Sequence, residues 1–277
     1  FFGVGTIVNK LFGWLPGIRR LCLRNYIVAR PTTTDNKSLP SVSVIIPCRN
    51  ERGNIEDAVR RMPRFCKEIE LLFVEGDSID GTAQEIDRVI HLFPDWNIRS
   101  LQQTGKGKGD AVRQGFAAAQ NNVLMILDAD LTVSPEALPQ FYDAFVAGKG
   151  EFINGSRLIY PMDPKAMRFL NLLANRAFSV LFSWLLNQRL TDTLCGTKVL
   201  SKRNYEKIAA SRTYFGEFDP FGDYDLLFGA SKLNLKMAEV PIRYAARTYG
   251  ETQISRFSDG WLLIRMVFFA WRKMKAF

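Results

Sequence analysis

Short apolar runs alternate with segments of helical character between residues 41 and 147, and this alternation limits the fold more than any other feature. The apolar runs predict strands at 41–47, 69–76, 96–101 and 122–129. The segments between and after them predict helices at 54–66, 80–92, 109–120 and 134–147, with Asn54 and Ser134 as N-caps and Pro135 at a first helical position. Strands that alternate with helices form a mainly parallel sheet covered on both faces. The sequence therefore predicts an α/β fold.

Acidic residues follow three of the four predicted strands. Glu51 follows the first strand, Glu75 and Asp77 lie at the end of the second, and the stretch MILDADL ends the fourth with Asp128 and Asp130. In a parallel sheet the ligand lies at the carboxyl ends of the strands, so one crevice can collect these acids.

Asp128 and Asp130 share a face if the strand continues through them. Two carboxylates held together repel each other unless a cation or a proton lies between them. An isolated pair of this kind also suits a polar turn in which one aspartate caps the next helix. The acids at the other strand ends favour a hard, oxygen-bound cation, Mg²⁺ or Mn²⁺.

The glycine-rich stretch TGKGKGDA, residues 104–111, precedes the third predicted helix and contains Lys106, Lys108 and Asp110. Glycines allow the backbone to approach a ligand closely, and a helix N-terminus favours anions. The stretch lacks the ending of a P-loop and the spacing of a dinucleotide-binding loop. A phosphate contact and a flexible turn both remain open.

The net charge of +9 favours an anionic partner, and the single histidine with four scattered cysteines argues against a zinc site. A basic nucleic-acid-binding module would explain the charge but not the acids at three strand ends. We therefore expect no nucleic-acid partner. A sugar nucleotidyltransferase would carry a glycine-rich signature near the first strand, and PCRNERGN does not supply one.

Several motifs occur together and in a characteristic order. They are SVIIPCRNE, VEGDSIDGT, GKGKGDAVRQGF, LDADL, FINGSR, TDTLCGTKVL, FGDYDLL and RTYGETQISRF. Over about residues 41–257 this set resembles family 2 glycosyltransferases of the GT-A fold, in the branch that includes polyprenyl-phosphate sugar transferases such as dolichyl-phosphate mannose synthase. The resemblance implies an inverting, metal-dependent enzyme with a UDP- or GDP-linked sugar donor and a polyprenyl phosphate acceptor. Transfer to a saccharide hydroxyl of a surface polysaccharide is the alternative.

The resemblance also implies roles on the donor side. Asp128 and Asp130 match the D-x-D that holds the metal and the donor diphosphate. Glu75 takes the place of the first acid of D-D-x-S, which recognises the base, while Gly76 replaces the second acid. The residues expected to bind the nucleotide sugar are Pro47, Arg49, Glu51, Glu75, Asp77, Lys106, Lys108, Asp110 and Asp128.

On the acceptor side, Asp223, Asp225 and Arg157 are the expected catalytic residues. Arg157, Arg247 and Gln253 are expected at the acceptor phosphate, with Gln253 in place of the lysine that ends the family's R-x-x-G-x-S-K. A saccharide hydroxyl would need an aspartate to take its proton, and Asp223 is the better candidate. A lipid phosphate is already largely an anion near neutral pH, because its second pKa is about 6.

Two further segments are apolar. Residues 169–188 carry a polar side chain at every fourth position, which predicts a helix with a narrow polar stripe. A core helix or a homo-oligomer interface and a helix at the lipid surface are both open for this segment. Residues 261–271 combine aromatic and apolar side chains with flanking bases, as in an interfacial anchor. No run reaches about 18 uninterrupted apolar residues.

We therefore expect a cytoplasmic protein associated peripherally with the inner face of the cell membrane. Three parts are expected along the chain: a basic and apolar segment with a linker at 1–40, a GT-A domain at 41–257 and an amphipathic membrane-interface helix at 258–277. The first part resembles the tail of a removed methyltransferase-like domain, and a second amphipathic membrane element is the alternative.

Overall fold

The structure is a computed structural model that describes Gly5, Phe12, Ala29 and residues 39–160, 169–211, 223–250 and 264–272. The side chains of 169–173 and 223 lie outside the description. Contacts divide the chain into two units, Phe1–Asp35 and Asn36–Phe277, and every element named below belongs to the second. The division into three parts expected from the sequence stays a prediction.

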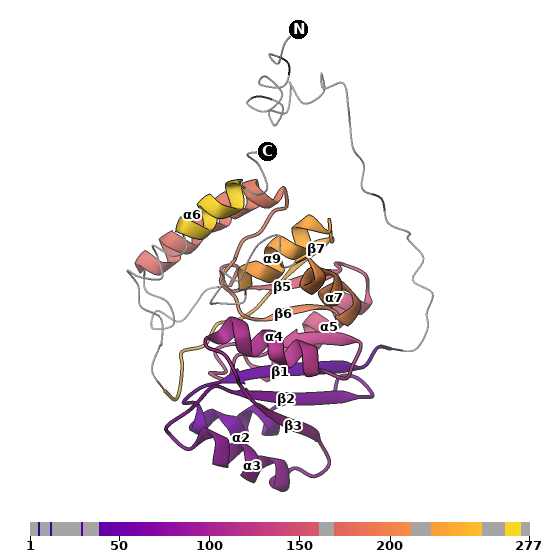
Figure 1. Ribbon diagram of the computed structural model, residues 1–277, viewed down its shortest axis with the longest axis vertical. Coiled ribbons are helices and arrows are strands. Elements are labelled where there is room, and N and C mark those ends of the chain that lie inside the picture. Colours follow the sequence, from indigo (N-terminus) through magenta and orange to yellow (C-terminus); the bar gives the residue numbers. More distant parts are fainter. Residues whose placement is uncertain are drawn as a thin grey trace. The chain divides into compact units, whose positions relative to one another are not determined.

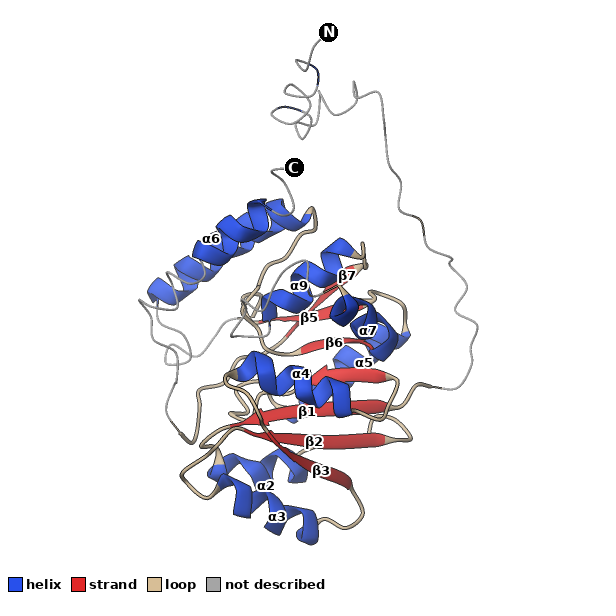
Figure 2. Ribbon diagram, in the orientation of Figure 1, coloured by secondary structure: helices blue, strands red, loops and turns tan. Residues whose placement is uncertain are grey.

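One sheet organises the described part of the second unit (Figures 1 and 2). Its strands are β1 (Val42–Cys48), β2 (Ile69–Glu75), β3 (Asn97–Gln102), β4 (Val123–Ile126), β5 (Phe152–Ser156), β6 (Lys198–Ser201) and β7 (Met237–Pro241). Their order is β3-β2-β1-β4-β6-β5-β7. All pairs are parallel except those of β6, which runs antiparallel to β4 and β5. The predicted mainly parallel sheet is confirmed.

Helices cover both faces of this sheet. They are α2 (Arg52–Arg60), α3 (Thr82–Leu92), α4 (Lys108–Ala118), the 3₁₀ turn η2 (Pro135–Ala137), α5 (Leu138–Val146), α6 (Phe169–Leu186), α7 (Lys202–Ala210) and α9 (Asp223–Lys232). Alternate residues of β1 point to opposite faces, as the strand geometry requires. Val44 and Ile46 pack with α2, α3 and α5, whereas Ile45 packs in a second core with α4, α6, α7, α9 and the helical residues 264–272.

The strand and helix ends differ from the expected ones in two places that matter for the site. Asn54 is not an N-cap, because α2 begins at Arg52 and Asn54 is buried within the helix. The fourth strand does not continue through the acids: β4 ends at Ile126, and the Leu131 N–H donates to the Asp128 carbonyl at 3.1 Å across a turn. Asp128 and Asp130 therefore lie on a turn, and the shared strand face expected for them is wrong.

The sheet changes winding direction between β1 and β4. The chain passes from β1 outward through β2 to β3 and then returns to the other side of β1 as β4. Pairing between β1 and β4 ends at Ile45 and Ile126, so Pro47, which has no N–H to donate, lies beyond the last paired residue. Such a switch point opens a crevice at the carboxyl ends of the strands.

Candidate functional site

The loops after β1 and β4 bring the predicted acids to this switch point. Glu51 follows β1 and is buried, while Asp128 and Asp130 follow β4 and are partly exposed. Each of the three carboxylates lies near a basic side chain from a distant part of the chain. Lys108 and Arg247 therefore offset part of the negative charge of the three acids.

Asp128 lies in a cluster of cations. The Lys108 Nζ atom at the start of α4 is 2.6 Å from Asp128 Oδ1. Burial raises the pKa of Asp128, but the Lys108 ammonium and its hydrogen bond outweigh this effect and hold the pKa below its usual range. The charges of Lys198 and Arg157 act in the same direction. The Gly196 backbone packs against this pair so closely that a Cβ atom there would overlap the Asp128 carboxylate and the Lys108 ammonium.

Arg247 bridges the other two acids. Its Nη1 atom donates to Glu51 Oε1 and its Nη2 atom donates to Asp130 Oδ2, each at 2.8 Å. Asp130 also accepts hydrogen bonds through Oδ1 from the Thr132 N–H at 3.1 Å and from its hydroxyl at 2.9 Å. Burial raises the pKa of Glu51 despite the opposing effect of Arg247. One guanidinium thus joins the loop after β1 to the turn after β4.

The segment around Arg247 follows β7 and lies against both loops. The Ala245 N–H donates to the Thr132 carbonyl at 3.0 Å. The Tyr249 hydroxyl donates to Asp80 Oδ2 at 3.2 Å, and the Tyr249 ring covers Gly53, where a Cβ atom would overlap it. These contacts explain why Arg247 reaches the acids from so far along the chain.

The acids fit a divalent ion. Their carboxylate oxygens are the hard donors that Mg²⁺ and Mn²⁺ prefer, and the cationic groups of Lys108 and Arg247 already stand where positive charge is required. No group of three or more potential metal-ligating side chains forms among the residues that the structure describes. A metal held by Asp128 and Asp130 therefore needs further ligands from outside the protein, such as diphosphate oxygens and water.

Replacing Arg247 with methionine is expected to strengthen Mn²⁺ binding in the absence of nucleotide, by about 10-fold at the site of Asp130. The reason is that a metal ion and the Arg247 guanidinium compete for the same carboxylate, and one such charged contact is worth roughly 1.5–3 kcal/mol. Calorimetric titration with Mn²⁺ measures the effect. Arg243→Met, which removes an exposed arginine of the same segment, is the control and should change nothing. Weaker Mn²⁺ binding by Arg247→Met would contradict the competition.

The second strand end provides a ready-made turn. Glu75 accepts hydrogen bonds from the Ser78 N–H at 2.7 Å and the Asp77 N–H at 3.3 Å. Burial raises the pKa of Glu75, but these bonds and its other hydrogen bonds lower it by more than burial raises it. The pKa of Glu75 is therefore below its usual value. Asp77 and Arg49 are exposed at the same edge of the sheet. Glu75 therefore stabilises the turn that would contact the nucleobase of the donor. Its role in binding the nucleobase stays a prediction.

The glycine-rich stretch forms a compact turn around Asp110. The Asp110 Oδ2 atom accepts hydrogen bonds at 3.0 Å from the Gly105 N–H and from Gln103 Nε2. Lys106 is exposed on this turn, whereas Lys108 reaches Asp128. Of the three residues predicted here, Asp110 shapes the turn and Lys108 enters the acid cluster.

Arg157 lies at the end of β5 in a buried ion pair. Its Nε and Nη2 atoms donate to the Asp192 carboxylate at 2.6 Å and 2.9 Å, and its guanidinium lies 5.1 Å from the centre of the Tyr244 ring. Sequence reasoning missed Asp192 and the fully buried Lys198, although both lie in the quoted stretch TDTLCGTKVL. The signal was a pair of opposite charges, Asp192 and Lys198, in an otherwise uncharged segment.

The remaining predicted residues contribute less to the described geometry. Asp225 is buried on α9, and Asp223 is the first residue of the same helix, with its side chain outside the described part. Gln253 also lies outside the described residues. Their catalytic and acceptor roles stay predictions.

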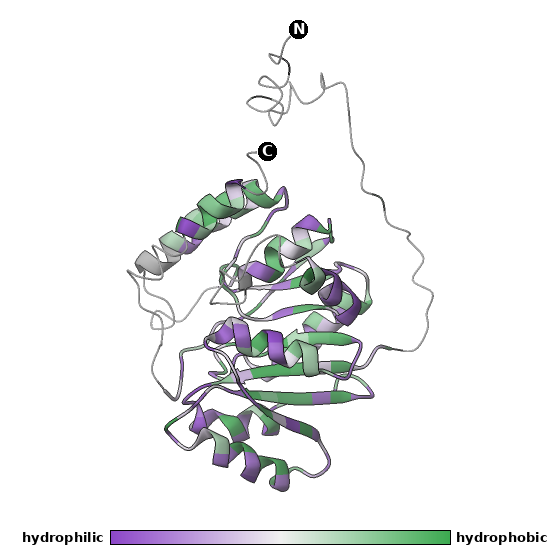
Figure 3. Cartoon of the chain, in the orientation of Figure 1, coloured by the Kyte–Doolittle hydropathy of each residue, from purple (hydrophilic) through white to green (hydrophobic). Residues whose placement is uncertain are grey.

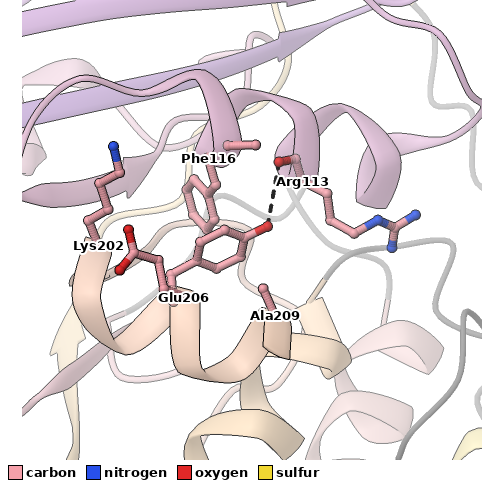
Figure 4. A pocket seen from close by; sticks show the side chains of 7 residues that line it. Arg113, Phe116, Lys202, Glu206 and Ala209 are labelled. Atoms are coloured by element: carbon pink, nitrogen blue, oxygen red, sulfur yellow. Dashed lines mark hydrogen bonds between the residues drawn. The ribbon is translucent and has the colours of Figure 1, made fainter. Parts of the chain in front are cut away.

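A separate hollow of about 350 Å³ lies between α4 and α7 (Figure 4). Its lining residues are Arg113, Phe116, Ala117, Lys202, Tyr205, Glu206 and Ala209. Ser201, which precedes α7, pairs with Val123 at the start of β4, so this hollow lies toward the amino ends of the strands. It contains none of the predicted site residues.

The sequence of the chain matches the family model described as Glycosyl transferase family 2 over residues 43–208, which is more than half of its length. The chain belongs to glycosyl transferase family 2. The fold agrees with this family. A structure of glucosyl-3-phosphoglycerate synthase from Mycobacterium tuberculosis, in complex with Mn²⁺, UDP and glucosyl-3-phosphoglycerate, superposes with a TM-score of 0.58 at 15% identity, covering 90% of this chain and 86% of that one. The predicted family and the GT-A fold are confirmed.

Relatives with curated names are similar in sequence. The dolichol-phosphate mannosyltransferase of Saccharomyces cerevisiae is 34% identical over 108 residues, covering 37% of this chain and 40% of that protein. The polyprenol monophosphomannose synthase of Mycolicibacterium smegmatis is 29% identical over 219 residues, covering 76% of this chain and 80% of that protein. The dolichol-phosphate mannosyltransferase of Pyrococcus furiosus is 28% identical over 218 residues, covering 77% of this chain and 59% of that protein. The chain thus spans less than two thirds of the yeast and Pyrococcus relatives.

Proposed function

We propose that this family 2 glycosyltransferase moves a sugar from a nucleotide-sugar donor to a polyprenyl phosphate at a membrane surface. The names of the relatives support this class of acceptor. The observation that carries the choice is helix α6, which buries Asn175 and Ser179 of its polar stripe and leaves apolar side chains exposed.

Helix α6 buries Phe182, Leu185 and Leu186 in the core, yet it also exposes apolar side chains while part of its polar stripe is buried. Asn175 and Ser179, from its polar stripe, are 1% and 7% exposed, whereas Val180 and Trp184 are 69% and 44% exposed. A helix on the surface of a water-soluble domain normally buries its apolar stripe and exposes its polar one. An outward apolar face on α6 suits contact with lipid.

The helical residues 264–272 are also mostly apolar in hydropathy (Figure 3). Met266 and Ala270 pack in the same core as Phe182 of α6, while Phe268 and Trp271 remain 58% and 40% exposed. Arginines but no acids occur in the sequence at 165–190 and at 260–277. Exposed aromatic and aliphatic side chains combined with positive charge favour an anionic lipid surface. No helix in the part of the chain that the structure describes could cross a bilayer.

The acids and bases at the switch point suit a nucleotide-sugar donor. A divalent ion held by Asp128 and Asp130 would neutralise charge that develops on the departing diphosphate. Lys108 can also stabilise the negative charge on the departing diphosphate, since its ammonium already reaches Asp128. When the donor binds, its diphosphate would draw the Arg247 guanidinium away from Asp130 and Glu51. Arg247 could then also contact the phosphate of the acceptor.

A phosphate acceptor also relaxes the need for a base. A saccharide hydroxyl must lose its proton to a carboxylate in the transition state. The described candidate, Asp225, is 7% exposed on α9. A phosphate monoester is already an anion and needs cations to position it. Arg247, which bridges Glu51 and Asp130, and Arg157, which follows β5, supply basic groups suited to that task.

The test is a transfer assay on vesicles. Polyprenyl phosphate in vesicles that contain acidic lipid is incubated with the protein, Mn²⁺ and a panel of radiolabelled UDP- and GDP-sugars. Label in the lipid fraction is expected for at least one sugar. Label that enters only a water-soluble saccharide acceptor would overturn the proposed acceptor.

The membrane surface makes its own prediction. The double replacement Trp184→Ser with Phe268→Ser is expected to weaken binding to acidic vesicles by about 10-fold or more, because each aromatic side chain contributes roughly 1.5–3 kcal/mol when it leaves water. Vesicle sedimentation measures the binding. Leu92→Ser, which removes an exposed leucine of α3, is the matched control and should leave vesicle binding unchanged. Equal vesicle binding by the double variant and the wild type would contradict this surface assignment.

A further inference from the structure

Asn175, a buried member of the polar stripe of α6, reaches the ion pair between Asp192 and Arg157. Asn175 Nδ2 donates a hydrogen bond to Asp192 Oδ1 at 3.0 Å. Ser179, the next buried member of the stripe, donates only within the helix, to the Arg176 carbonyl at 2.8 Å. The two residues share a helix face, but only Asn175 bonds to a side chain outside the helix.

Asp192 is the hub of this contact. Its carboxylate accepts hydrogen bonds from Arg157 Nε, from Arg157 Nη2 and from the Arg157 N–H at 3.1 Å. It also accepts from the Leu194 N–H at 3.0 Å. The Asp192 side chain is 0% exposed, so each bond acts where water does not compete.

The backbone on either side of Asp192 is held from β7 and β5. Glu239 Oε1 accepts from the N–H of Thr191 at 2.9 Å and from the N–H of Asp192 at 3.2 Å. Asn154 Nδ2 donates to the Asp192 carbonyl at 2.6 Å. These bonds fix the main chain, and Asn175 supplies a side-chain contact that orients the carboxylate from the helix.

Arg157 is what this arrangement holds in place. It follows β5, and its guanidinium is almost completely buried. Just before it, the Gly155 N–H donates to the Thr197 carbonyl at 3.0 Å, and the neighbouring Gly196 packs against the Asp128 carboxylate. A guanidinium gripped on one edge by a carboxylate keeps its plane and its remaining N–H groups in one orientation. The orientation of Arg157 therefore depends on the orientation of Asp192.

We propose that Asn175 is a positioning residue for the transfer reaction: through Asp192 it sets the orientation of the Arg157 guanidinium, next to the segment that packs against Asp128. The inference rests on the proposed function in one respect, namely that Arg157 acts on the phosphate or sugar at that site. It links α6, whose outer face is apolar, to the reaction site through one side-chain hydrogen bond.

The first measurement needs no substrate. In protein labelled with ¹⁵N-arginine, the Arg157 Nε–H signal is assigned by its loss in Arg157→Lys. We expect Asn175→Leu to raise the exchange rate of this proton with water by about 10-fold or more, since a hydrogen bond to a charged group is lost from the hub. Ser179→Ala is the matched control and should leave the rate unchanged. Asn175→Ser, a smaller polar side chain that falls short of Asp192, should show the same faster exchange if Asn175→Leu fails to fold.

The second measurement separates positioning from stability. Turnover is followed as release of nucleoside diphosphate with the best sugar donor, and donor affinity is measured separately by calorimetry. Asn175→Leu should lower kcat about 10-fold with donor Kd unchanged, but less than about 2-fold in the Arg157→Lys background, because coupled residues are not additive.

The outcomes are separable. An unchanged Arg157 exchange rate in the Asn175 variants overturns the inference, as does an equal loss of kcat in both backgrounds. A protein that shows the exchange effect but transfers no sugar to polyprenyl phosphate contradicts the proposed function and leaves the positioning contact intact.

Discussion

Asp130→Ala is expected to abolish the dependence of nucleotide-sugar binding on a divalent metal, with a loss of donor affinity in Mn²⁺ of about 100-fold or more. Even the loss of a residue that only supports a metal ligand typically costs 10–100-fold, and Asp130 is one of only two protein carboxylates proposed to hold the ion. The replacement also leaves Arg247 with Glu51 as its remaining acid of the bridge. Calorimetric titration with the preferred nucleotide sugar, with and without Mn²⁺, measures the effect.

The control for this variant is Asp143→Ala, which removes an exposed acid of α5 away from the strand ends. It should bind the donor as the wild type does and keep the full response to Mn²⁺. Donor affinity that is the same with and without Mn²⁺ in the wild-type protein would exclude the metal assignment for Asp128 and Asp130.

Asp192→Ala is expected to lower the free energy of unfolding by about 3–5 kcal/mol, because it leaves the Arg157 guanidinium buried without its counter-charge. Both side chains of this pair are almost completely buried, so water cannot replace the missing carboxylate. Denaturant-induced unfolding at neutral pH measures the loss. The double replacement Arg157→Met with Asp192→Leu should recover a large part of it, since an apolar pair leaves no isolated charge. If the double variant is as unstable as Asp192→Ala, charge imbalance is not the cause.

The same pair gives stability a defined pH dependence. Burial raises the pKa of Asp192, but the charge of Arg157 and the hydrogen bonds to the carboxylate lower it by more than burial raises it. The pKa of Asp192 is therefore below its usual value. The unfolded chain therefore binds a proton at this residue more readily than the folded one does. Its contribution is fully present above the unfolded pKa of about 3.9 and is lost as the pH falls toward the folded value.

Much of the donor half of the site could be predicted from local sequence. The runs around 41–47, 69–76 and 122–129 specify strands through their own apolar pattern, and parallel strands put the residues that follow them at one edge. Glu51, Asp128 and Asp130 were found in this way, and the structure brings all three to the switch point. The expected strand through Asp128 and Asp130 was wrong because Leu131 takes a left-handed conformation, with φ of 52°, and closes a turn. The apolar pattern does not reveal such a turn.

The second half of the sheet could not be predicted in the same way. Strand β6 runs antiparallel between β4 and β5, and its partners come from segments far apart in the chain. Asp192 and Glu239 gain their partners only from this arrangement, since the motif around Asp192 does not name the residues that it contacts. The buried bond between Arg157 and Asp192 joins residues 35 positions apart, a separation without periodic signature.

By itself, the sequence determined the family, the alternation of strands and helices, the acids at the strand ends and the polar stripe of residues 169–188. These features depend on residues that are close in the chain. In a strand or a helix, the spacing of such residues determines which way their side chains point. Only the tertiary structure decided that Asn175 and Ser179 of the stripe are buried, that Arg247 bridges two acids 196 and 117 residues away, and that Asn175 reaches Asp192. The physical reason is that a charged side chain or a helix face contacts the groups that the folded chain places next to it. The spacing of residues along the chain does not reveal which groups these are.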